Sequence, residues 1–193
     1  MSSGIDDGER VEPATLDEWR AWLAANHTRT TGVWVVLRKP SVSGPGVGYV
    51  ESVEQALCFG WVDSKAKGLD AERTLQWFSP RRARSGWARP NKQRVERLLA
   101  AGLMAPAGLA VVEAAKADGS WTLLDDVEDL VVPDDLAAAF DARPGSREHW
   151  DAFPRSPRRM MLVWLVEARR PETRAKRVTE IAERAAAGER ARG

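Results

Sequence analysis

Apolar residues near the start of the chain recur at the spacing of a helix, and those that follow have the pattern of a β-strand. Leucines and tryptophans fall on one helical face over residues 16–23, and the Thr15 side chain just before them is a suitable helix cap. Residues 32–38 are β-branched and aromatic and predict a strand. A glycine-rich loop over residues 41–48 separates this strand from a short predicted helix over residues 52–59.

Two segments with a period of two follow. Residues 61–65 and 73–78 alternate large and polar side chains, which is the pattern of strands with one buried face. Gly68 supplies a turn between them. We therefore expect a β-hairpin whose strands belong to a small antiparallel sheet.

Helical patterns dominate the rest of the chain. Pro90 can begin a helix, because the backbone N–H groups of the first helical turn have no acceptor within the helix, so a proline there loses no hydrogen bond. Apolar spacing predicts further helices over residues 104–117, 134–141, 146–153, 156–168 and 171–187. The predicted fold class is α+β: a small antiparallel sheet with packed helices, followed by an all-helical C-terminal half.

The same patterns predict the organisation of the chain. Residues 1–14 read as a disordered leader, and residues 15–124 as the α+β region that holds a candidate pocket. Residues 125–188 form a helical C-terminal region of the same compact unit, and residues 189–193 a charged tail. A chain of 193 residues is long enough for one domain with a sizeable core.

Composition narrows the class of protein. The apolar fraction is 44% and the charged fraction 30%, which is ordinary for a folded protein. Cys58 is the only cysteine, so a disulfide framework is excluded, and two histidines with one cysteine give no zinc pattern. No apolar run approaches the roughly 20 residues of a membrane helix. We expect a cytoplasmic protein with no cofactor, no metal and no membrane insertion.

Charge is unevenly distributed although the net charge is only +1. Basic residues dominate residues 81–97 and 155–177, and acidic residues dominate the stretch between them. These blocks either pair with each other or form an anion-binding surface. Stacking aromatics among arginines are compatible with single-stranded nucleic acid. A net charge near zero and the lack of a known motif make nucleic acid an unlikely partner.

A candidate binding site lies on the predicted hairpin. Period-two geometry puts Trp61, Asp63 and Lys65 on one face, and Gln76 and Phe78 on a matching face. Such a surface would be an aromatic floor with a few polar groups, as in small-molecule pockets. The full set of candidate ligand-binding residues is Trp61, Lys65, Arg73, Gln76, Phe78, Arg81, Arg82, Ser85, Trp87 and Asn91.

Arginines give this site its expected specificity. Arg73, Arg81 and Arg82 can bind carboxylate or phosphate through two parallel hydrogen bonds. Asp63 and Glu54 are the candidate catalytic residues, as general acids or bases. Two plainer interpretations stay open: a structural Asp63–arginine bridge and a solvated carboxylate at Glu54.

Several longer segments resemble the YdeI/OmpD-associated family, also labelled bacteriocin-protection proteins. The matching segments are ALCFGWVDS (56–64), FSPRR (78–82), SGWARPNKQRVERL (85–98), GLMAPAGLAVVEAAKADGSW (102–121) and FPRSPRRMMLVWLVEARRPETRAKRV (153–178). The resemblance extends from Leu16 to about Gly188. Ser64 stands where the family commonly has glycine, and Gly86 where it has lysine.

This resemblance implies a link to outer-membrane proteins and to protection against antimicrobial peptides, and it brings no catalytic residues with it. The preferred hypothesis is a small-molecule or peptide-binding protein with a detoxification or self-resistance role, whose ligand is aromatic and anionic. The alternative is a cofactor-free hydrolase, isomerase or cyclase that uses Asp63 or Glu54. A second alternative is a nucleic-acid-binding protein.

Overall fold

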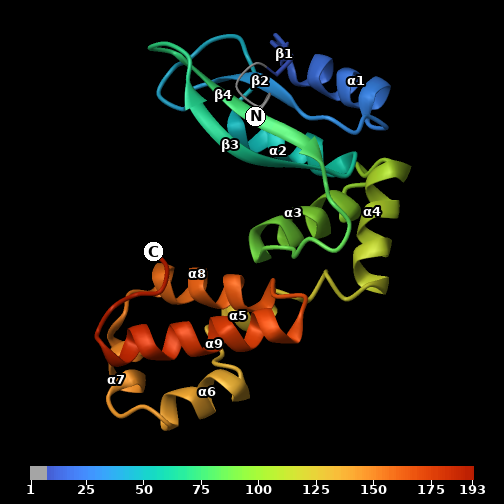
Figure 1. The fold of residues 1–193 in the computed structure, drawn as a ribbon. Helices are drawn as coiled ribbons and strands as arrows, with labels where there is room; N and C mark the ends of the chain where they lie inside the picture. Colours follow the sequence, from blue (N-terminus) through green and yellow to red (C-terminus); the bar gives the residue numbers. More distant parts are fainter. Residues whose placement is uncertain (1–7) are drawn as a thin grey trace. The chain divides into compact units, whose positions relative to one another are not determined.

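The computed structural model describes residues 8–193, and residues 1–7 lie outside the described part. The chain forms two compact units (Figure 1). The first unit consists of Pro90–Trp121 and the described residues up to Ser85, and the second of Gly86–Arg89 and Thr122–Gly193. The boundary predicted from the sequence between the α+β region and the helical region lies slightly later, after residue 124. That both regions form one compact body stays a prediction.

The described elements of the first unit are β1 (Arg10–Val11), α1 (Leu16–Asn26), β2 (Val33–Arg38), α2 (Tyr49–Cys58), β3 (Trp61–Gly68), β4 (Arg73–Pro80), α3 (Arg89–Ala100) and α4 (Pro106–Ala117). Thr15 caps α1, because its hydroxyl accepts a hydrogen bond from the backbone N–H of Glu18 at 3.2 Å. The predicted capping residue is thus confirmed.

The sheet has the strand order β1-β2-β4-β3. β2 pairs antiparallel with β4, and β4 with β3, so the predicted hairpin is confirmed. The prediction of a purely antiparallel sheet is wrong, because β1 pairs in parallel with β2. β1 lies within the predicted leader: Arg10 is opposite Trp34 and Val11 opposite Val35. Residues 1–7 of that leader lie outside the described residues.

One face of the sheet carries the core of the first unit. Trp19 of α1 packs on Phe78 of β4, with ring centroids 5.4 Å apart, and Trp22 meets Trp61 edge-on at 5.6 Å. The indole N–H of Trp19 donates to the carbonyl of Ser52 at 3.0 Å, which ties α1 to α2. Each fully buried large side chain contributes about 1.5–3 kcal/mol to folding. The opposite face buries the smaller cluster of Trp34, Val36 and Leu75.

The described elements of the second unit are α5 (Asp125–Glu128), α6 (Asp134–Asp141), α7 (Ser146–Ala152), α8 (Arg155–Val166) and α9 (Pro171–Ala186). Its core gathers apolar side chains from all five helices, including Val127, Leu136, Trp150 and Leu165. The short α5 lies in a stretch for which the sequence predicted no helix. The predicted α+β class, with a helical C-terminal region, is confirmed.

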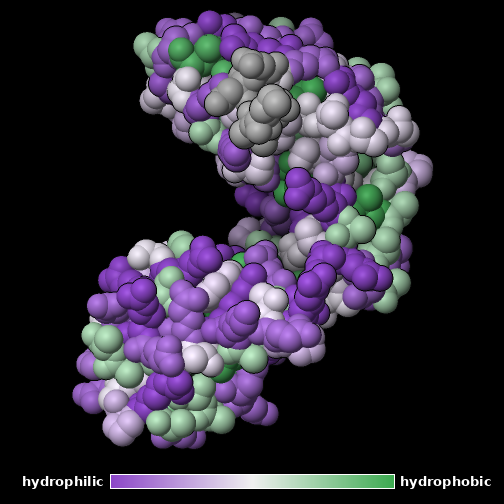
Figure 2. All heavy atoms as spheres, viewed as in Figure 1, coloured by the Kyte–Doolittle hydropathy of each residue, from purple (hydrophilic) through white to green (hydrophobic). Residues whose placement is uncertain are grey.

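The visible surface of each unit is mostly hydrophilic, with small separate hydrophobic areas (Figure 2). Among residues 8–193, no helix combines the length and the apolar character that crossing a bilayer requires.

Candidate functional site

A hydrogen-bonded polar group surrounds Asp63 in the first unit. The Tyr49 hydroxyl donates to Asp63 Oδ2 at 2.8 Å, and Gln76 Nε2 donates to the same oxygen at 3.4 Å. Tyr49 begins α2, whereas Asp63 lies on β3 and Gln76 on β4. Asp63 is directly opposite Phe78, so its side chain shares a sheet face with Gln76. We call Tyr49, Asp63, Gln76 and the neighbouring Arg81 the Asp63 cluster.

Burial and charge set the protonation states in this cluster. The Tyr49 side chain is only partly buried. Partial burial and the hydrogen bond to Asp63 raise the pKa of Tyr49 to about 12, although Arg94 acts in the opposite direction. Burial lowers the pKa of Arg81 to about 10, while the Asp63 carboxylate opposes that change. At neutral pH the cluster therefore holds a neutral phenol and a charged guanidinium.

A second guanidinium group, that of Arg94, lies near the Asp63 cluster. Arg94 of α3 donates from Nη1 to Asn91 Oδ1 at 2.8 Å, so Asn91 orients it. The Asp63 carboxylate thus lies near Arg81, and the positive charge of Arg94 acts on the Tyr49 hydroxyl. A carboxylate held this way can accept a proton or bind a cationic group, and the guanidinium groups can bind an anion.

The predicted aromatic floor is not an accessible surface. Trp61 and Phe78 are both 0% exposed, because α1 covers them with Trp19 and Trp22. The two rings therefore lie in the core of the first unit and cannot contact a ligand without a rearrangement of α1. Trp87 is also buried, and it belongs to the second unit.

Lys65 is displaced by an irregularity in β3. The pairing shifts between Asp63 and Ala66, which opposes Gln76, so β3 contains one extra residue there. The extra residue breaks the alternation that placed Lys65 on the same face as Asp63. Lys65 is exposed instead.

Glu54 lies outside the Asp63 cluster. It forms an ion pair with Arg97 of α3, with Nη2 and Oε1 3.2 Å apart. Five residues of helix separate Glu54 from Tyr49, a rotation of about 140° around α2. The two candidate carboxylates, Asp63 and Glu54, therefore have different surroundings. Near Glu54, burial raises the pKa of the Cys58 thiol, so this cysteine is a buried thiol at neutral pH.

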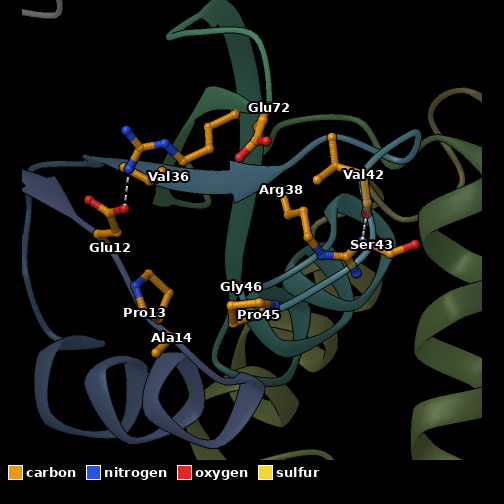
Figure 3. Close-up of a pocket in the computed structure, with 11 residues that line it drawn as sticks. Glu12, Pro13, Ala14, Val36, Arg38, Val42, Ser43, Pro45, Gly46 and Glu72 are labelled. Atoms are coloured by element: carbon orange, nitrogen blue, oxygen red, sulfur yellow. Dashed lines mark hydrogen bonds and ion pairs between the residues drawn. The ribbon is translucent and has the colours of Figure 1, made fainter.

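A cavity of about 390 Å³ lies elsewhere in the first unit (Figure 3). Pro13 and Ala14, from the linker between β1 and α1, form one wall. The glycine-rich loop forms the other wall with Val42, Ser43, Pro45 and Gly46, and Arg38 extends from β2 toward Val42 and Ser43. The volume is within the range of small-molecule pockets, about 300–1,000 Å³.

Arg73 is the predicted binding residue that lines this cavity. Its guanidinium contacts Glu12 at 2.5 Å and Asp70 at 2.7 Å. Arg82 lines a different cavity of about 410 Å³, together with Trp77, Arg29 and Ser79. Ser85 donates its hydroxyl hydrogen to the carbonyl of Arg82 at 2.7 Å, which shapes the turn after β4.

The predicted site residues therefore separate into several places. Asp63, Gln76 and Arg81 come together, Arg73 and Arg82 line two cavities, and the tryptophans are in the core. Sequence reasoning missed Tyr49 and Arg38. Tyr49 is the only tyrosine of the chain, and Arg38 directly precedes the glycine-rich loop, which are the two signals that could have singled them out.

Within residues 8–193, no three His, Cys, Asp or Glu side chains gather in a way that could hold a metal ion. The fold and the Figure 3 cavity define an α+β protein with a ligand-sized cavity in its first unit.

Residues 11–111 match the model of a family described as a domain of unknown function (DUF8412), and the chain belongs to this family. Residues 129–188 match the model of the family described as bacteriocin-protection, YdeI or OmpD-associated. The resemblance to that family is thereby confirmed for the C-terminal part of the chain. Neither the curated proteins nor the solved structures contain a match.

Proposed function

We propose that this protein binds a small molecule or a short peptide and has a detoxification or self-resistance role. The Figure 3 cavity carries the proposal, because it combines a ligand-sized volume with apolar walls and two guanidinium groups. The protective role is suggested by the description of the family that the C-terminal part matches. We place this activity in the cytoplasm, where a binding protein would lower the free concentration of a toxic compound.

Filling the cavity tests this proposal. Ala14 lines the cavity, and its backbone already donates to Glu18 and accepts from Gly46, so a larger side chain leaves both bonds possible. In an Ala14→Phe variant the ring would occupy the space of a ligand. Saturation-transfer NMR with a low-molecular-weight cell extract should show bound compounds for the wild type and none for this variant.

Ala21→Phe is the matched control, because Ala21 is an exposed residue of α1 and does not line the cavity. In cells, a strain lacking the protein is challenged with peptide antibiotics and complemented with each version. The wild type and Ala21→Phe should restore growth, and Ala14→Phe should not. Equal ligand binding and equal protection by both variants would show that the cavity is not the binding site.

A cofactor-free enzyme is the second candidate, favoured by the 2.8 Å contact between Tyr49 and Asp63. In such a hydrolase, isomerase or cyclase, Asp63 would act as the general base beside the neutral Tyr49 phenol. Extract from a strain lacking the protein is incubated with wild-type protein or with Asp63→Asn, and metabolites are compared by mass spectrometry. A compound consumed equally by both proteins would exclude this role for Asp63.

A further inference from the structure

Two groups of opposite charge line the Figure 3 cavity without an ionic partner among residues 8–193. Arg38 makes one hydrogen bond with its guanidinium, from Nη1 to the carbonyl of Val42, and its Nε–H is buried with no acceptor in that part of the chain. The carboxylate of Glu72 has no hydrogen bond or ion pair there, and it is exposed to solvent.

The remaining charges of the cavity are already compensated. Arg73 is held between Glu12 and Asp70, at 2.5 and 2.7 Å. Lys39, close in sequence, directs its ammonium to the carbonyls of Asp70 and Ala71 at 2.7 and 3.2 Å. One positive and one negative group therefore remain for a ligand.

This arrangement disfavours a ligand with a single sign of charge. An anion attracted by Arg38 would also meet the Glu72 carboxylate, and a cation attracted by Glu72 would meet Arg38. A ligand with both charges meets an opposite charge at each end. Val36, Pro13 and Pro45 also line the cavity, and they offer apolar contacts for an aliphatic section of such a ligand.

We infer that the cavity binds a zwitterionic, aliphatic short peptide, with its carboxylate at Arg38 and its amino group at Glu72. The inference rests on the proposed function, and it replaces the expected aromatic, anionic ligand with a zwitterionic one. A guanidinium fork is suited to a carboxylate, since it can donate two parallel hydrogen bonds. The exposed Glu72 contributes less, since solvent weakens its attraction for an ammonium group.

Blocked dipeptides test each end separately. The probes are Val-Val with free ends, its N-acetyl form, its C-terminal amide, and the doubly blocked form. Calorimetric titration of the wild type should show about tenfold weaker binding when the carboxylate is amidated. Acetylation of the amino group should weaken binding about threefold.

Variants assign these effects to residues. Arg38→Met should bind the free and amidated peptides equally, whereas Glu72→Gln should bind the free and acetylated peptides equally. Arg10→Met and Glu51→Gln are matched controls at exposed residues that do not line the cavity, and they should behave like the wild type. Because Arg38→Met also removes the bond to Val42, Arg38→Lys is added: it keeps the charge and should retain part of the preference for a free carboxylate.

The outcomes separate the inference from the proposed function. If all four probes bind equally and Ala14→Phe abolishes binding, the cavity binds ligands but zwitterion recognition is wrong. If none of the four probes binds, the inference is also wrong, and the extract experiment decides the proposed function by itself. A preference for free ends that persists in both Arg38→Met and Glu72→Gln would likewise contradict the inference.

Discussion

At the scale of single residues, Tyr49 offers a direct measurement. Burial and the hydrogen bond to Asp63 raise its pKa to about 12. Since Tyr49 is the only tyrosine, the phenolate absorbance near 295 nm reports this group alone. We expect a titration midpoint near 12 in the wild type, and a lower midpoint in Asp63→Asn that stays above 10, because burial, the largest cause of the shift, remains.

The same pKa has a consequence for stability. A pKa that is higher in the folded state means that folding retains the phenol proton, so this stabilisation is complete below about pH 10 and is lost as the pH rises toward 12. Tyr49→Phe should lose less stability than the wild type over this interval. Far-UV circular dichroism at each pH checks that the protein is still folded, and identical alkaline curves for both proteins would contradict the assignment.

Asp63 also has a structural role that can be measured. It is the carboxylate that opposes the effect of burial on Arg81, so removing it leaves a largely buried guanidinium without that compensation. We expect Asp63→Ala to lower the free energy of unfolding by about 1–3 kcal/mol. Urea unfolding of Asp63→Ala, Arg81→Gln and the double variant measures the coupling. Strictly additive losses would show that the two side chains do not interact.

At the scale of elements, the packing of α4 against the end of α2 depends on Gly108. A Cβ at this position would lie 2.2 Å from the carbonyl oxygen of Cys58. In an unobstructed helix, alanine is favoured over glycine by about 1 kcal/mol. Here the clash with backbone outweighs that gain, and we expect Gly108→Ala to destabilise the protein by about 1–3 kcal/mol.

Gly68→Ala is the matched control, because no atom lies within 4 Å of a Cβ placed at Gly68. Thermal unfolding should show a lower melting temperature for Gly108→Ala and little change for Gly68→Ala. A melting temperature of Gly108→Ala at or above that of the wild type would mean that α4 can shift without cost.

Helices and the hairpin could be predicted because their signals are local. The Thr15 cap and the apolar spacing of α1, and the apolar spacing of α6, are contained in the segments themselves. β1 has two residues and forms only through its parallel pairing with β2, which no local pattern indicates. The bulge in β3 likewise depends on its register with β4, so the face of Lys65 could not be predicted.

The arginines of the second basic block, residues 155–177, contact acidic and aromatic side chains within the second unit. Arg159 forms two hydrogen bonds with Glu128, and Arg174 two with Asp135. Arg177 lies over the Trp164 ring, with its guanidinium carbon 4.9 Å from the ring centroid. Much of this positive charge is therefore used inside the second unit.

At the scale of the whole molecule, the candidate site could be predicted only in part. Asp63, Gln76 and Arg81 come together because the hairpin fixes their spacing. The Figure 3 cavity instead combines the β1–α1 linker, the end of β2, the glycine-rich loop and the turn before β4. These segments are brought together by tertiary contacts such as the hydrogen bond from Gly46 to Ala14, which sequence spacing does not reveal.

Part of the acid response of the molecule should be traceable to the second unit. Hydrogen bonds from Arg159 hold the pKa of Glu128 below its usual value of 4.5, and those from Arg174 lower the pKa of Asp135. A lowered pKa in the folded state gives stabilisation that is present above the unfolded value and is lost as the pH falls through the folded value. The free energy of unfolding should therefore decrease below about pH 4.5.

Glu128→Gln removes one of these titrating groups with little change in size. Glu128 is only 9% exposed and its two oxygens face Arg159, so we expect a loss of about 1–2 kcal/mol at pH 7 and a weaker dependence on pH below 5. Asp151→Asn is the control, because the Asp151 carboxylate stays exposed in its ion pairs with Arg147 and Arg158, which should contribute less than about 0.5 kcal/mol each. Urea unfolding at pH 7, 5, 4 and 3 measures both variants. Parallel curves for Glu128→Gln and the wild type would show that this ion pair does not control the acid response.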